Sequence, residues 1–122
     1  MIQTRSKLVL ADNTGIHLLQ VIRILGGSKR RFGRIGDVTV AAVKQADPSC
    51  LYKKGLVVLA LIVRTKKEKS RPDGSTVRFD DNAAVIIGKD KLPKGTRIFG
   101  PIAREIKDLG YKKIASMAQE IV

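Results

Sequence analysis

The stretch from Val63 to Ile87 limits the fold of this chain more than any other, because it places a charged arm between two apolar runs. Leu56–Val63 leads into the arm and Ala83–Ile87 follows it, and both are apolar runs of strand length. At its tip, Pro72–Gly74 combines a proline that presets a turn dihedral, an aspartate that can bond its own backbone, and a glycine that accepts positive φ. The stretch therefore predicts a β-hairpin that projects from two core strands.

Three further segments, all before the arm, are typical of strands. Lys7–Ala11 is short, Val38–Lys44 is mostly apolar, and Ile16–Leu25 is long but interrupted by polar residues, so its two faces should be unequally wetted. We expect His17 on the wetter face. About five short strands in succession favour a small closed barrel, because closure removes exposed edges in a domain of this size. An open sandwich is the alternative.

The C-terminal part of the chain has the marks of a helix. Pro101 suits the first helical position, and Gly110 can end the helix. The apolar residues between them fall on one helical face, at Ile102, Ile106 and Leu109. One more short helical turn is expected within Lys112–Ala118.

The expected fold class is therefore all-β, a small closed five-stranded β-barrel with a projecting β-hairpin and a short helical C-terminal region. The length predicts a single domain over residues 1–122. We expect the barrel to occupy about residues 1–100 and the helical region about residues 101–122.

The charge of the chain indicates a polyanionic partner. There are 24 Lys and Arg against 11 Asp and Glu, a formal net charge of +13 on 122 residues, which exceeds what solubility requires of a small domain. Glycines let a backbone approach phosphate closely, and arginine grips phosphate through a planar fork. We expect contacts to RNA from the glycine-rich loop before Val38, the arm and the loop after Ile87. The candidates are Lys29, Arg30, Arg31, Arg34, Arg64, Lys66, Lys67, Lys69, Arg71, Arg78 and Lys94.

A catalytic role is not expected. Asp80 and Asp81 are the best carboxylates for a metal-dependent nuclease, but neighbours in a strand point to opposite faces and cannot easily share one ion. His17 is the one histidine and Cys50 the one cysteine, and neither has a partner at the spacing of a metal site or an activated nucleophile. We expect no enzyme activity, no cofactor and no metal. The longest apolar run is also far shorter than the roughly 18 residues that span a bilayer, so no membrane contact is expected.

A free single-stranded nucleic-acid-binding module of the OB type is the alternative function. Such modules stack bases on aromatic side chains. This chain has three Phe and two Tyr, several of which the core needs, and we expect Phe32 to be tucked into the core. Contact with the backbone and shape of structured RNA therefore suits the composition better.

Short sequence motifs occur in a fixed order through the arm and its flanks. They are Leu61-Ile62-Val63, then after nine residues Asp73-Gly74, after four Phe79, after two Asn82, and after two more Val85-Ile86. This order resembles the signature of the fourteenth protein of the large ribosomal subunit. The opening Met1–Gln3 also matches the family, and the short N-terminus resembles its bacterial and organellar branch. Further matching words cover nearly the whole chain, at Leu10–Gly15, Leu25–Ser28, Ile35–Asp37, Lys53–Gly55, Val63–Lys67, Gly95–Pro101 and Ala103–Glu105.

The resemblance implies a structural constituent of the ribosome, bound to large-subunit ribosomal RNA at the face that meets the small subunit. It also implies contacts with the neighbouring large-subunit proteins three and nineteen, and bridges to small-subunit RNA. In bacteria and organelles the same face of this family is the docking surface of a ribosomal silencing factor that blocks subunit joining. By carry-over, Thr96, Arg97 and Lys113 would lie on or near that surface. The expected location is the ribosome of the cytoplasm or of an organelle.

Overall fold

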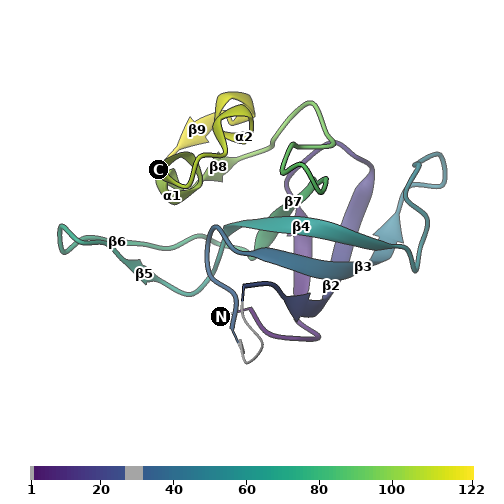
Figure 1. Ribbon diagram of the computed structural model, residues 1–122, viewed down its shortest axis with the longest axis horizontal. Helices are drawn as coiled ribbons and strands as arrows, with labels where there is room; N and C mark the ends of the chain where they lie inside the picture. Colours follow the sequence, from purple (N-terminus) through teal and green to yellow (C-terminus); the bar gives the residue numbers. More distant parts are fainter. Residues whose placement is uncertain (1, 27–31) are drawn as a thin grey trace.

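A closed barrel of five strands forms the centre of the computed structural model, which describes residues 2–26 and 32–122 (Figure 1). The strands are β1 (Lys7–Leu10), β2 (Ile16–Ile24), β3 (Val38–Ala46), β4 (Val57–Arg64) and β7 (Ala83–Ile87). They follow one another around the barrel in the order β1-β2-β3-β4-β7, and all neighbours are antiparallel except β7 and β1, which close the barrel in parallel. The predicted all-β barrel is confirmed, with strands close to their predicted bounds.

Strand β7 and residues 60–63 of β4 are apolar, and both of their faces are buried. Successive residues of a strand point to opposite faces. Ala60 and Ile62 of β4 pack in the cluster that fills the barrel, whereas Leu61 and Val63 belong to a second cluster outside it. The second cluster joins the barrel to the C-terminal region through Ile102, Ala103, Ile106 and Ile114. A continuous apolar run is the pattern expected of a strand covered on both faces.

Strand β2 has one drier and one wetter face, as predicted. Ile16, Leu19 and Val21 are buried, whereas His17 is exposed. The Nε2 atom of His17 lies 2.7 Å from Oδ1 of Asp47, also exposed. This histidine therefore makes a surface contact with a neighbouring turn.

The arm, residues 64–82, forms the predicted hairpin from β5 (Lys69–Ser70) and β6 (Thr76–Val77), and Figure 1 shows it extending away from the barrel. At its tip Gly74 has φ +89°, and its N–H donates to the carbonyl of Arg71 at 3.0 Å. Oδ1 of Asp73 accepts the N–H of Ser75 at 3.0 Å, the local bond expected of an aspartate in this turn. The Ser75 hydroxyl donates to the same Oδ1 at 2.6 Å, and this bond together with that from the Ser75 N–H lowers the pKa of Asp73.

The C-terminal region differs from its prediction at the start of the first helix. Pro101 begins a short strand, β8 (Pro101–Ile102), and α1 (Arg104–Asp108) starts after Ala103, so the predicted helix start at Pro101 is wrong. Proline is accepted at the first residue of a strand. Strand β8 pairs in parallel with β9 (Glu120–Ile121), a pairing that the sequence pattern did not indicate.

The end of α1 agrees with its prediction at Gly110 and differs at Leu109. Gly110 has φ +97° and its N–H donates to the carbonyl of Lys107, while Tyr111 N–H donates to that of Ile106, which is a Schellman end. Leu109 lies beyond the last helical residue and is 59% exposed, so its predicted place on the buried face is wrong. The second helical segment is α2 (Lys112–Met117), as predicted. No helix in the described part of the chain is long and apolar enough to cross a membrane.

Candidate nucleic-acid and partner interface

The glycine-rich loop is described only in part. Lys29, Arg30 and Arg31 lie outside the described residues, so their predicted role in RNA binding remains a prediction. Arg34 is exposed in the turn before β3, and its backbone N–H donates to Oδ2 of Asp37 at 2.7 Å. Phe32 is 39% exposed, so the prediction that it is tucked into the core is wrong. Among the described residues of this loop, Ile35 is a buried apolar side chain.

At the base of the arm, the backbone is fixed while the cations are exposed. Oδ1 of Asn82 accepts the N–H of Lys66 at 2.8 Å, and the Thr65 hydroxyl donates to the carbonyl of Lys67 at 2.9 Å. The side chains of Lys66, Lys67 and Arg78 form no ion pair or hydrogen bond with any other described residue. A fixed backbone reduces the ordering cost of binding. The base of the arm therefore presents three cations that are free to contact an anionic partner.

Arg64 is used inside the fold. Its side chain is 11% exposed, and its guanidinium donates to the carbonyls of Phe99 and Pro101 at 3.0 and 3.3 Å and pairs with Asp81, with 3.0 Å between Nε and Oδ1. Gly100 has φ +79° and lies against this guanidinium, where an added Cβ would collide with Nη1. Arg64 thus ties the end of β4 to the segment that leads into β8, and Asp81 serves as its counter-ion.

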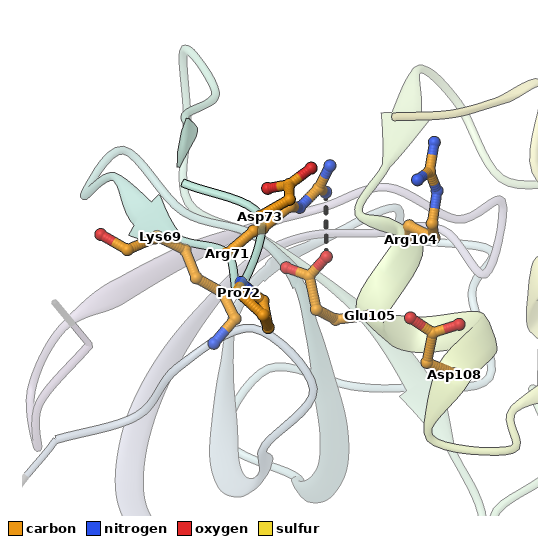
Figure 2. A pocket seen from close by; sticks show the side chains of 8 residues that line it. Lys69, Arg71, Pro72, Asp73, Arg104, Glu105 and Asp108 are labelled. Atoms are coloured by element: carbon orange, nitrogen blue, oxygen red, sulfur yellow. Dashed lines mark ion pairs between the residues drawn. The ribbon is translucent and has the colours of Figure 1, made fainter. Parts of the chain in front are cut away.

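Arg71 joins the arm to the C-terminal region (Figure 2). Its Nη2 lies 2.9 Å from Oε1 of Glu105 in α1 and donates to the main-chain oxygen of Val122 at 2.6 Å. A groove of about 580 Å³ runs between hairpin and helix, and the side chains around it carry both signs of charge. Its lining residues are Lys69, Ser70, Arg71, Pro72, Asp73, Arg104, Glu105 and Asp108. A mixed-charge groove is a poorer phosphate site than the exposed base of the arm.

The loop between β7 and β8 carries Lys94, Thr96 and Arg97, all exposed. Oδ1 of Asn13 accepts the N–H of Thr96 at 2.8 Å and that of Arg97 at 3.1 Å, while Nδ2 donates to the Thr96 hydroxyl at 2.8 Å. The guanidinium of Arg97 forms no ion pair with any described residue, and Glu105 of α1 pairs with Arg71. Lys113 is exposed on α2.

The turn after β1 is held by a buried carboxylate. Oδ2 of Asp12 accepts the N–H of Ile86 and Oδ1 accepts the hydroxyl of Thr14, both at 2.8 Å. Burial raises the pKa of Asp12 above its usual value, and the hydrogen bonds oppose that shift. Asp12 thereby fixes the turn from which Asn13 reaches the loop that carries Thr96.

Sequence reasoning overlooked Asn13 and Asn82, the two amides that fix the loops behind the exposed cations. Both lie in words that carried the family resemblance, at Leu10–Gly15 and in the signature after Phe79. Their presence in these matching segments was the one indication in the sequence that they matter. Their partners are 83 and 16 residues distant along the chain, and no local periodicity reveals such pairs.

Comparison with known families gives a match over the whole chain. The family model described as ribosomal protein L14p/L23e matches residues 1–122. The match therefore includes the barrel, the arm, the loop with Thr96 and Arg97, and the C-terminal region alike.

Proposed function

The chain belongs to the ribosomal protein L14p/L23e family, structural constituents of the large ribosomal subunit rather than enzymes, and on this premise we propose that it binds large-subunit ribosomal RNA through its exposed cations. Lys and Arg at a protein surface contact phosphates and position the protein without reading base sequence. For structured RNA, such contacts accompany recognition of shape.

This proposal rests on a difference among the predicted cations: some are bound to acceptors inside the fold, and the others are exposed. Arg64 and Arg71 are occupied by internal acceptors, and we assign them to the fold. The cations assigned to RNA are exposed and make no side-chain ion pair with other described residues, at Arg34, Lys66, Lys67, Arg78 and Lys94. Lys69 borders the groove beside α1 and is included with them. Lys29, Arg30 and Arg31 are included on the sequence pattern alone.

Protein partners and bridges form a second part of the proposal. We assign Thr96, Arg97 and Lys113 to a surface where a ribosomal silencing factor docks, at the face that also bridges to small-subunit RNA. All three are exposed and the guanidinium of Arg97 pairs with no described carboxylate, and both observations support this assignment. Large-subunit proteins three and nineteen are the proposed neighbours, in a ribosome of the cytoplasm or of an organelle.

The alternative of a free OB-type module is disfavoured by the barrel itself. An OB-fold is a Greek-key barrel, whereas the strands here follow one another in sequence order around the barrel. Few aromatic residues are also available to stack on bases. Among the described residues, Phe32 and Phe99 are exposed and the other aromatic side chains are half-buried.

Replacing the free cations at the base of the arm tests RNA binding in the cell. Lys66→Ser, Lys67→Ser and Arg78→Ser together should leave the fold intact, since exposed substitutions each change the free energy of unfolding by less than about 0.5 kcal/mol. The variant should nevertheless show reduced occupancy in large subunits, because three phosphate contacts are lost. Sedimentation of tagged protein from cell extract, with quantitation in the large-subunit fractions, measures this occupancy.

A charge-preserving variant is the matched control for that experiment. Lys66→Arg, Lys67→Arg and Arg78→Lys alter the same side chains but keep every positive charge, so occupancy should remain near that of the original protein. If the serine variant entered large subunits at full occupancy, the arm would be a solvated ribbon without a role in binding.

A further inference from the structure

Asn13 holds the loop before β8 through both backbone and side-chain groups. Its Oδ1 accepts two consecutive backbone N–H groups, those of Thr96 and Arg97, and its Nδ2 donates to the Thr96 hydroxyl. Two amides bound to one oxygen restrict the peptide between Thr96 and Arg97. The direction in which the Arg97 side chain leaves the backbone is therefore set by Asn13.

The neighbouring residues seat the loop closely against the turn after β1. Phe99 N–H donates to the carbonyl of Ala11 at 2.6 Å, and Ile98 is buried where it forms a bridge with Asp12. A Cβ added to Gly95 would lie 2.8 Å from Oδ1 of Asn13 and 3.2 Å from Cβ of Asp12. The loop is thus held against this turn both before and after Arg97, and glycine at position 95 permits the close approach.

These contacts leave the Arg97 side chain available to a partner. It is exposed, and its guanidinium is not paired with any described carboxylate. An arginine whose backbone is already fixed loses less conformational freedom when it binds, and a planar guanidinium suits a carboxylate in a two-point contact.

We infer that Asn13 is a positioning residue of the partner surface, which holds Arg97 ready for a carboxylate of a protein partner. The inference rests on the proposed role of Thr96 and Arg97 in docking and adds the residue that pre-organises them. Asn13 acts on Arg97 through the backbone of the loop, so most of its contribution requires Arg97 to be present.

Amide hydrogen exchange and partner binding together test this role. Asn13→Ala should speed exchange at the amides of Thr96 and Arg97 and weaken binding of the ribosomal silencing factor to purified large subunits by about tenfold, the net effect of about one hydrogen bond. Asn13→Asp should rescue both measurements. Its carboxylate still accepts the two N–H groups, and the Thr96 hydroxyl can turn to donate to it.

Asn82→Ala is the matched control, because Asn82 holds the amide of Lys66 in the same way at the base of the arm. It should speed exchange at Lys66 and leave silencing-factor binding unchanged. Gly95→Ala is a second route to the same disturbance, since the new Cβ would displace Asn13 without removing it. It should reproduce the effects of Asn13→Ala.

A double variant separates this inference from the docking proposal. In an Arg97→Ala background, Asn13→Ala should cause a much smaller loss of affinity than it does alone, the remainder being its effect on Thr96. If Asn13→Ala freed both amides without changing affinity, or weakened binding equally in both backgrounds, positioning by Asn13 would be refuted while docking at Arg97 stood. If Arg97→Ala alone bound like the original protein, the docking proposal itself would fail, and the inference with it.

Discussion

At the scale of single residues, Arg64 and Arg78 have different surroundings although both belong to the arm, because Arg64 contacts internal acceptors and Arg78 is exposed. Arg64→Met should lower the free energy of unfolding by about 1–3 kcal/mol, because the carbonyls of Phe99 and Pro101 lose a charged donor. Arg78→Met, the matched control on an exposed residue, should change it by less than about 0.5 kcal/mol. Urea denaturation of the two variants measures the difference. Equal effects would show that the contacts of Arg64 do not stabilise the fold.

Sequence analysis grouped Arg64 and Arg71 with Lys66 as candidate RNA-binding cations. It could not distinguish them, because their acceptors are distant along the chain. The carbonyl partners of Arg64 are 35 and 37 residues away, and that of Arg71 is 51 residues away. Composition and charge identify a cation but not its acceptor. Only the fold, by bringing these carbonyls to the arm, separates internal cations from free ones.

At the scale of elements, the hairpin is attached to α1 by the Arg71–Glu105 pair. Glu105→Gln should weaken this attachment and speed amide exchange at the hairpin tip, with a loss of about 1 kcal/mol for a pair that is only partly exposed. The bond from Arg71 to Val122 remains and limits the effect. Exchange measured by nuclear magnetic resonance at Arg71 and Gly74 reports the change.

Asp108→Asn is the matched control for this attachment. Asp108 lies on the same helix and lines the same groove, but it forms no ion pair with the described residues. Its replacement should leave hairpin exchange unchanged. If the two variants behaved alike, the ion pair would contribute nothing to holding the hairpin against α1.

The sequence predicted long elements well and short ones poorly. Strands β4 and β7 could be found because burial on both faces produces unbroken apolar runs. Strands β8 and β9 pair over two residues each, which is too short for any periodicity. Pro101 misplaced the helix start because proline is favoured both at the first turn of a helix and at the first residue of a strand.

At the scale of the whole molecule, the packed core and the charged arm are separate parts of the structure. The C-terminal region packs on the outer faces of β4 and β7, and the arm extends from the same two strands (Figure 1). The arm can therefore carry charge without a hydrophobic core of its own, because it connects two strands that pack in the core. This arrangement separates stability, which resides in the two apolar clusters, from binding, which we assign to exposed cations.

Salt should weaken binding of the whole protein to large-subunit ribosomal RNA steeply, because its formal charge of +13 displaces counterions from phosphates. Each phosphate contact contributes about 0.7–0.9 to the slope of log affinity against log salt. Replacing Lys66, Lys67 and Arg78 by Ser should therefore flatten the slope by about 2 to 3. Filter binding at several salt concentrations measures it.

Arg64→Met and Arg78→Met provide a charge-matched comparison in the same assay. Each removes one positive charge, but Arg64 is held by internal acceptors and Arg78 is free, so only Arg78→Met should reduce the slope. If both reduced it equally, net charge alone would govern binding and the division among cations would have no meaning for RNA. Tight binding of the free protein to a single-stranded homopolymer would instead favour the OB-type alternative, because base stacking on aromatic side chains contributes about 1–3 kcal/mol per base and tolerates any sequence.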